Sequence, residues 1–163
     1  MTSAHSFAIV AATSAEDLDA IRNLFRAYVD WLGIDLSYQG FDEELAGLPG
    51  KYTPPAGALF LARDHDGSVL GCVGLRGFGK AGHCEMKRLY VLPAGRGRGV
   101  GAALVGRVVA AAEEAGYREM LLDTLPRMTG AIKLYTASGF EETPAYYDTP
   151  IAETVFFRKR LAV

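Results

Sequence analysis

The residues with the clearest chemical potential are Arg96-Gly97-Arg98-Gly99-Val100-Gly101, which stand between an apolar run and a helix-like run. Glycines let the main chain approach a ligand closely. The first amides of a helix have no partner inside the helix, and together with the helix dipole they favour a phosphate or pyrophosphate. We therefore expect the backbone amides from Gly97 to Ala102 to bind an anionic ligand.

The two arginines of this turn could add cationic donors to such a site. Arg96 precedes the turn, and Arg98 lies within it. For Arg98 a solvent-exposed position is an equally good interpretation, because its side chain follows the entry of the helix.

Apolar periodicity and turn residues predict the elements that must position this site. Thr13 and Glu16 have the spacing of a capping box and would begin the first helix, which should end near Gly33. The remaining pattern predicts strands at 7–12, 58–63, 69–78, 84–91, 119–124, 140–143 and 154–161, and helices at 42–46, 100–115 and 129–137. The fold class is α/β (α+β), with a mixed, mostly antiparallel twisted sheet flanked by helices on both faces and one βαβ unit at 85–124.

Length and composition indicate an ordinary globular protein. The chain has 163 residues, 50% of them hydrophobic, and a formal net charge of -2, so we expect one domain over residues 1–163. A nucleic-acid binder would usually show a basic excess, which is missing here. The sequence holds neither a signal-peptide core nor an apolar membrane span, which favours a cytoplasmic protein without a membrane partner.

The two cysteines favour neither a disulfide nor a metal site. With a hairpin turn at 79–82, facing residues have numbers that sum to about 161, which sets Cys72 opposite a residue near 89 rather than opposite Cys84. His65 and His83 sit at predicted turns, and the histidines and cysteines do not cluster with the spacing of metal ligands. We therefore expect free thiols and no metal.

Two classes of protein share a strand, a glycine turn and a helix. One is the dinucleotide-binding βαβ unit, which needs an acid on the strand after the helix. Asp123 meets that need, 24 residues after Gly99. Against this class, the preceding strand ends at Pro93, several residues before the glycines, and the N-terminal half predicts a strand meander rather than further βα units.

The other class is indicated by two motifs together. Arg96, Gly99 and Gly101 fit the pattern (Gln/Arg)-x-x-Gly-x-(Gly/Ala), and residues 134–140, Leu-Tyr-Thr-Ala-Ser-Gly-Phe, fit Leu-Tyr-x-x-x-Gly-Phe. On these residues the chain resembles the GCN5-related N-acetyltransferase superfamily. The order of the predicted elements agrees with that family along nearly the whole chain.

The resemblance implies acetyl-CoA as cosubstrate and an N-acetyltransferase as the activity. The pyrophosphate of the cosubstrate would lie at the glycine turn, and its pantetheine arm would run beside Leu89, Tyr90 and Val91. A backbone amide near Val91 would then hold the thioester carbonyl oxygen, which gains negative charge during attack. One residue departs from the family, because Met128 stands where relatives often have an asparagine that contacts the pantetheine.

The resemblance also implies two catalytic residues. Glu85 stands 11 residues before Arg96, where some relatives carry a glutamate base. Glu85 could instead pair with Lys87, Arg88 or a cross-strand arginine such as Arg76. Tyr135 occupies the place of a tyrosine that donates to the sulfur of the leaving CoA, although a core tyrosine would also fit that position.

The acceptor would be a primary amine, either of a small molecule or of a peptide or protein, that attacks directly and is held by loops opposite the cosubstrate. Tyr38, Tyr146 and Tyr147 are candidate substrate-binding residues, because aromatic side chains suit a small cationic amine. A covalent route through cysteine is disfavoured, since neither thiol stands beside an obvious base. The competing class is a non-catalytic module that binds acetyl-CoA and signals its level.

The chain also has a possible route to a homodimer. Relatives in the superfamily are often dimers, and the closing strand could offer residues Val155 to Arg158 as an edge for pairing.

Overall fold

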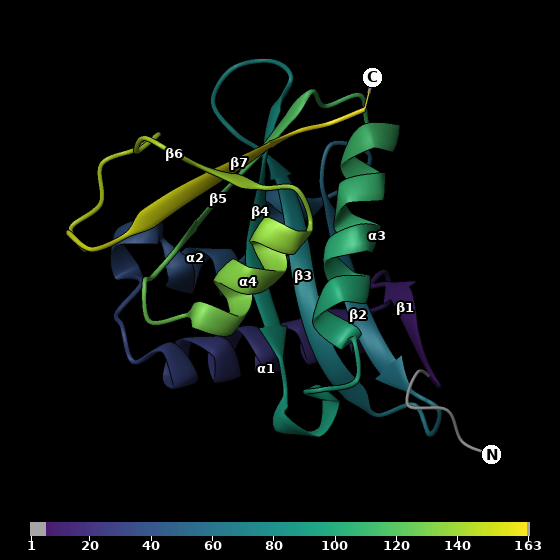
Figure 1. Cartoon of the computed structure of the whole chain (residues 1–163). Helices are drawn as coiled ribbons and strands as arrows, with labels where there is room; N and C mark the ends of the chain where they lie inside the picture. Colours follow the sequence, from purple (N-terminus) through teal and green to yellow (C-terminus); the bar gives the residue numbers. More distant parts are fainter. Residues whose placement is uncertain (1–5, 163) are drawn as a thin grey trace.

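The computed structural model describes residues 6–162, and its centre is a seven-stranded sheet in the order β1-β2-β3-β4-β5-β7-β6 (Figure 1). The strands are β1 (Phe7–Ala11), β2 (Ala58–Asp64), β3 (Val69–Gly77), β4 (His83–Val91), β5 (Glu119–Thr124), β6 (Glu141–Thr143) and β7 (Val155–Arg160). The helices are α1 (Ala15–Leu32), α2 (Phe41–Ala46), α3 (Val100–Glu114) and α4 (Thr129–Ala137), with short 3-10 turns η1 (Ser37–Gln39), η2 (Gly50–Tyr52) and η3 (Pro93–Gly95).

The direction of the strands confirms the predicted fold class. Within the described residues β4 and β5 are the one parallel pair, and every other neighbouring pair is antiparallel. Helix α3 connects β4 to β5, which is the predicted βαβ unit. A doubly wound dinucleotide-binding sheet needs several parallel strands, so that interpretation is wrong.

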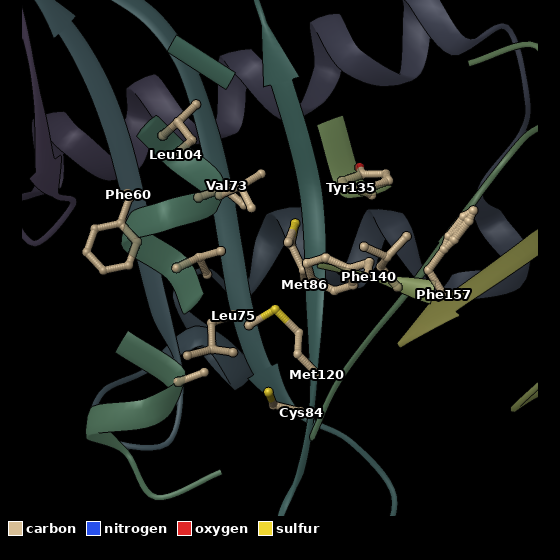
Figure 2. Close-up of a cluster of buried hydrophobic side chains, with 14 of the residues drawn as sticks. Phe60, Val73, Leu75, Cys84, Met86, Leu104, Met120, Tyr135, Phe140 and Phe157 are labelled. Carbon is tan, nitrogen blue, oxygen red and sulfur yellow. The ribbon is translucent and has the colours of Figure 1, made fainter. Parts of the chain in front are cut away.

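Helices cover both faces of the sheet, as predicted. Helices α3 and α4 lie in front of the sheet in the view of Figure 1, and α1 and α2 lie behind it. Each side has its own hydrophobic core. The first core joins α3 to residues such as Met86 and Met120 and includes Tyr135 of α4 (Figure 2). The second joins α1 and α2 to residues such as Leu61 and Tyr90.

The hairpin of β3 and β4 has the predicted register. Arg76 faces Glu85, and Cys72 faces Tyr90 rather than Cys84. The two cysteines are free and buried, and they belong to the cores on opposite faces of the sheet. The alternation of side chains along a strand explains this separation.

Two sequence predictions are wrong in detail. The capping box of α1 is formed by Ser14 and Asp17, whose side chains each accept from the other's backbone amide, and not by Thr13 and Glu16. Strand β7 does not offer a free edge through Val155–Arg158, because it pairs with β5 on one side and β6 on the other. The short β6 takes the outer position, so β1 and β6 are the edges of the sheet.

Between residues 6 and 162, no helix is both long and apolar enough to cross a membrane.

Candidate active site

The parallel strands β4 and β5 separate after a short paired segment. They pair only at His83–Glu119, Cys84–Met120 and Glu85–Leu121. Beyond Glu85, β4 continues to Val91 with no strand partner on its β5 side among the described residues. The sheet is therefore split at its centre, and the unpaired stretch of β4 forms one wall of an interior opening.

A bulge in β4 determines which side chains face this opening. The register against β3 shifts between Cys72 and Gly74, so Arg88 and Leu89 both lie opposite Val73. Arg88 adopts φ 59, a left-handed conformation that costs a non-glycine residue about 1–2 kcal/mol. As a result the neighbours Lys87 and Arg88 both reach toward η1 on the α2 side, where each contacts Gln39.

The glycine turn has the backbone geometry on which the predicted anion site depends. Gly97 and Gly99 have positive φ values of 76° and 82°, and Gly99 caps α3 without any side-chain cap. Among the described residues, the backbone amides of residue 97 and of residues 99–102 donate to no carbonyl. Open amides and a helix dipole of this kind favour an anionic group.

Three neighbouring spaces lie along the split sheet from this turn, and each is defined by its lining residues. The outer groove has a volume of about 360 Å³ and is lined by Trp31, Leu89, Tyr90, Val91, Gly95, Arg96, Gly97, Gly99, Val100, Gly101, Met128, Gly130, Ala131 and Leu134. The split cavity, about 40 Å³, is lined by Tyr28, Met86, Lys87, Arg88, Leu89, Leu122, Asp123, Thr124, Met128, Ala131 and Tyr135. The loop pocket, also about 40 Å³, is lined by Tyr28, Leu32, Ile34, Leu36, Tyr38, Gln39, Arg88, Asp123, Thr124, Leu125, Met128, Ile151 and Thr154.

Shared lining residues place these spaces next to one another, and the three together are called the path. Leu89, Met128 and Ala131 line both the outer groove and the split cavity. Asp123 and Arg88 line both the split cavity and the loop pocket. The split cavity therefore adjoins both the outer groove beside the glycine turn and the loop pocket.

Most of the residues predicted to hold the cosubstrate lie together in the outer groove. Arg96 is there, with its Nε donating to the Val91 carbonyl at 3.2 Å and its guanidinium 5.7 Å from the Trp31 ring centre. Ala102 and Arg98 do not line the groove. Arg98 forms a two-bond ion pair with Asp64 at 3.0 Å, so its predicted phosphate contact stays a prediction.

Tyr135 lines the split cavity from α4. Its ring packs against Phe140 and Phe157 in the core shown in Figure 2. Burial raises the pKa of Tyr135 well above its ordinary value, so the phenol keeps its proton at neutral pH. The side chain therefore combines a fixed position in the core with a proton that it can donate.

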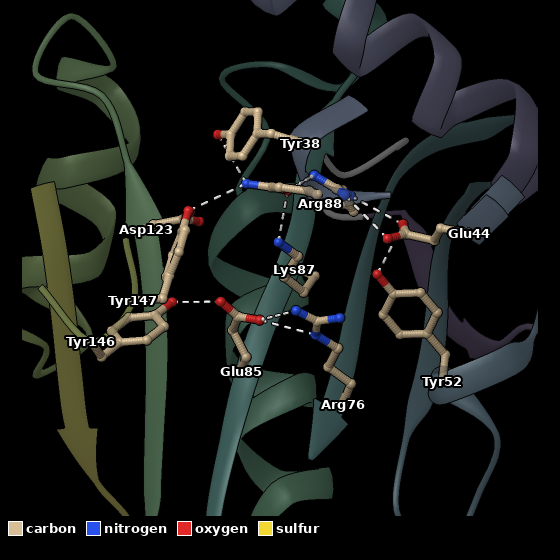
Figure 3. Close-up of polar contacts among 11 residues, drawn as sticks. Tyr38, Glu44, Tyr52, Arg76, Glu85, Lys87, Arg88, Asp123, Tyr146 and Tyr147 are labelled. Carbon is tan, nitrogen blue, oxygen red and sulfur yellow. Dashed lines mark hydrogen bonds and ion pairs between the residues drawn. The ribbon is translucent and has the colours of Figure 1, made fainter. Parts of the chain in front are cut away.

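Glu85 lies just before the split and is almost completely buried, with 1% of its surface exposed. Its Oε1 accepts from Arg76 at 2.8 and 3.0 Å, and its Oε2 accepts from the Tyr146 hydroxyl at 2.5 Å (Figure 3). Glu85 lines none of the three spaces. Both carboxylate oxygens are occupied, and the pairing with Arg76 is the alternative that the sequence left open.

The other predicted tyrosines lie around a second carboxylate, Asp123. The Tyr147 hydroxyl donates to Asp123 Oδ2 and lies 3.3 Å from Gln39 Nε2. The Tyr38 hydroxyl accepts from the same Gln39 nitrogen at 3.1 Å. Burial and then the charge of Asp123 raise the pKa of Tyr147, which keeps its hydroxyl a donor.

Several residues at this centre were not predicted as functional residues. Lys87 and Arg88 appeared only as possible partners of Glu85, Gln39 was not assigned a role of its own, and Asp123 was considered only for a dinucleotide ribose. Asp123 lies near the end of β5, across from β4, and this position was the signal that could have identified it. Gln39 gives no such signal, because η1 brings it to the site through tertiary packing alone.

Comparisons with known proteins identify the family. The sequence profile of the Acetyltransferase (GNAT) family matches residues 18–140. The chain is 41% identical over 157 residues to an uncharacterized N-acetyltransferase from Schizosaccharomyces pombe, with 96% of each chain covered. It is 33% identical to an uncharacterized N-acetyltransferase from Dictyostelium discoideum, over 88% of this chain and 94% of the relative. A crystal structure of a GNAT-family acetyltransferase from Staphylococcus aureus, only 18% identical, has the same fold, with a TM-score of 0.79 over 96% of this chain and 99% of that chain.

The chain therefore belongs to the Acetyltransferase (GNAT) family, as the two sequence motifs indicated. Its relatives are named N-acetyltransferases, so it is an enzyme of the acyltransferase class.

Proposed function

We propose that this enzyme transfers the acetyl group of acetyl-CoA to the primary amine of a small acceptor by direct attack. The observation that carries this proposal is the path of adjoining spaces, outer groove, split cavity and loop pocket, along the gap between β4 and β5. Such a path lets two substrates enter from different sides and meet at one point.

The residues around the outer groove fit acetyl-CoA, which would supply an acyl group activated as a thioester. The free amides of residue 97 and of residues 99–102 suit its pyrophosphate, and Arg96 adds a cation at the same end of the groove. The unpaired edge of β4 from Leu89 to Val91 offers backbone groups to a narrow, amide-containing arm.

We assign the base to Asp123 in preference to Glu85. A primary ammonium group has a pKa of about 10, so at neutral pH it must lose a proton before it can attack. Asp123 lines both the split cavity and the loop pocket, and its Oδ1 accepts no hydrogen bond within the described part of the chain. Glu85 has no free oxygen and does not line the path. The base role predicted for Glu85 stays a prediction that the same experiment tests.

Tyr135 is the proposed proton donor at the opposite side of the split cavity. The Tyr135 hydroxyl keeps its proton at neutral pH. The Tyr135 side chain lines the split cavity, as Asp123 does. A positioned phenol can protonate a departing thiolate and so favour its release.

The test is the release of CoA from acetyl-CoA with a panel of primary amines. Asp123→Asn should lower kcat by about 10²–10⁴-fold, the usual contribution of a general base, and Tyr135→Phe should also lower it. Both variants should still bind acetyl-CoA, which a shift in Tm would show.

Full turnover by Asp123→Asn would contradict the assignment of the base. If no amine supports CoA release although acetyl-CoA raises the Tm, the protein is a binding module and the proposed function is wrong.

A further inference from the structure

The split cavity is lined by a buried cation, Lys87, that no carboxylate of the described residues contacts directly. Lys87 is 5% exposed and Arg88 is 6% exposed. Arg88 is neutralised by Glu44, which it contacts through two nitrogens at 3.1 Å (Figure 3). Lys87 forms no ion pair within the described residues, and its one hydrogen-bond acceptor is Gln39 Oε1 at 3.1 Å. Burying an ammonium without an anion is unfavourable, and this burial lowers the pKa of Lys87.

A single amide oxygen lies between the two cations. Gln39 Oε1 accepts from Lys87 Nζ at 3.1 Å and from Arg88 Nη1 at 2.8 Å. The nitrogen of the same amide lies 3.3 Å from the hydroxyl of Tyr147, which donates to Asp123. The amide can adopt only this orientation, because its NH₂ group would otherwise face two cations. One small group therefore contacts cations at its oxygen end and a tyrosine–aspartate pair at its nitrogen end.

This arrangement is complementary to a molecule that carries a carboxylate and an amine close together. In an α-amino acid the two groups are separated by one carbon more than the oxygen and nitrogen of an amide. A carboxylate in place of Gln39 Oε1 would neutralise Lys87, and the amine would then lie on the side of Asp123. From these contacts we infer that the acceptor is a free α-amino acid, whose carboxylate binds Lys87 and Arg88 after Gln39 moves aside. The inference rests on the proposed function, which it makes more specific.

Gln39 is suited to leave this position. It belongs to the three-residue turn η1, which has no buried residue and ends at Gly40 in the left-handed conformation, φ 71°. The side chain is half-buried, and it lines the loop pocket together with Arg88 and Asp123. Its departure would enlarge that pocket beside apolar side chains such as Leu36 and Ile151, which could contact the body of an amino acid.

The experiment compares CoA release with a panel of natural amino acids and with the corresponding amino-acid carboxamides. For each pair, kcat/KM of the acid is divided by kcat/KM of the amide, first in the wild type and then in Lys87→Met. Comparing these ratios between the two proteins cancels the different basicity of the amines. Lys87→Met should lower the ratio about tenfold or more, as expected for loss of a hydrogen bond to a charged group. The matched control is Lys80→Met at the exposed hairpin turn, which should leave the ratio unchanged.

A binding measurement without acetyl-CoA gives a second readout. The preferred amino acid should raise the Tm of the wild type, its carboxamide should not, and the effect should disappear in Lys87→Met. Gln39→Ala should bind the amino acid about twofold to tenfold more tightly, because an internal hydrogen-bonded competitor is removed.

Each of three results would overturn the inference while the proposed function stands: amines without a carboxylate serve equally well, Lys87→Met slows acids and amides alike, or Gln39→Ala weakens binding of the amino acid. Absence of CoA release with every amine would instead contradict the proposed function itself.

Discussion

At the scale of single residues, Glu85 and Asp123 show how partners decide what a carboxylate can do. Both belong to the parallel pair of strands at the centre of the sheet. Arg76 and Tyr146 occupy both oxygens of Glu85, whereas Tyr147 occupies only one oxygen of Asp123. A base needs a free lone pair that faces the substrate, so we expect Glu85 to support the structure and Asp123 to take the proton.

This division of roles predicts a loss of stability for Glu85→Gln. The change leaves the Arg76 guanidinium against a neutral amide in a buried position, which should cost about 1–3 kcal/mol. The free energy of unfolding from urea titrations measures the effect. The matched control is Glu141→Gln, which breaks the ion pair with Arg158 at the edge of the sheet, where Glu141 is 65% exposed, and should cost less than about 1 kcal/mol. A stable Glu85→Gln enzyme with strongly reduced kcat would instead identify Glu85 as the base.

The sequence could predict single residues only where a motif or a neighbour in the chain identified them. The glycine turn and Tyr135 carry motifs, and Arg76 could be proposed as a partner of Glu85 because a hairpin register fixes which residues face each other. The contact of Gln39 with Lys87 joins residues that are 48 positions apart and depends on how η1 packs on the sheet. No periodicity or spacing encodes such a contact.

At the scale of elements, the first turn of α3 depends on glycine at its cap. Gly99 has φ 82°, where a side chain is strained, and no side chain caps the helix. The amides of the following residues therefore stay open toward the outer groove. Gly101 has a different role, because a Cβ there would lie 3.1 Å from Leu134 of α4. The same run of glycines thus serves both an open anion site and the close packing of two helices.

Gly99→Ala should lower both stability and acetyl-CoA affinity. The left-handed conformation costs alanine about 1–2 kcal/mol, and any relief of that strain rotates the amides away from the groove. Gly106→Ala in the middle of the same helix is the matched control, because a Cβ there would meet nothing within 4 Å. It should stabilise the helix by about 1 kcal/mol. Calorimetry and urea titration measure both quantities, and unchanged affinity in Gly99→Ala would show that these amides do not hold the cosubstrate.

The bulge in β4 is a feature of one element that could not be predicted from the sequence. The pattern over residues 84–91 predicts an ordinary strand, and nothing marks Arg88 as a residue with φ 59°. An arginine in a left-handed conformation is unfavourable by local preference. Arg88 is held in this conformation by Glu44 of α2 and Gln39 of η1, so only the complete fold explains it.

At the scale of the whole molecule, the order of the elements was predictable and the outer edge of the sheet was not. Hydrophobic periodicity predicted the strands, the helices and the βαβ unit, because each buries a face with its own period. The error concerned β7, which was expected at an edge. Its neighbour β6 has only three residues, and such a short strand gives a weak pattern even though it determines which strand is exposed.

Burial of many tyrosines predicts that the whole molecule loses stability in alkali. Burial raises the pKa of Tyr28 from 10.0 to about 12 and also raises the pKa values of Tyr52, Tyr135 and Tyr146. Between pH 10 and about 12 the unfolded chain would release protons that the folded protein retains, so stability that is present below pH 10 is lost as the pH rises. Lys87 acts in the opposite direction, because its pKa is lowered in the fold, but it is a single group.

The measurement is the Tm across this pH range, together with tyrosinate absorbance as a monitor of ionisation. Tyr28→Phe should weaken the fall in Tm, whereas Tyr38→Phe, at a tyrosine that is 37% exposed, should not. A constant Tm between pH 10 and 12 would contradict the prediction.

The separation of β4 from β5 has a consequence for how the protein avoids self-association. Exposed backbone groups along a strand invite pairing with other polypeptides, which is a common origin of aggregation. Here the vacant hydrogen-bonding side of β4 faces inward and is sheltered by α1 and α4, whose residues Tyr28 and Tyr135 lie across it. The cavity on that side of β4 has a volume of only about 40 Å³, which leaves no room for a strand of a neighbouring protein chain. The unpaired backbone groups of β4 therefore lie inside the protein, where other copies of the chain cannot pair with them.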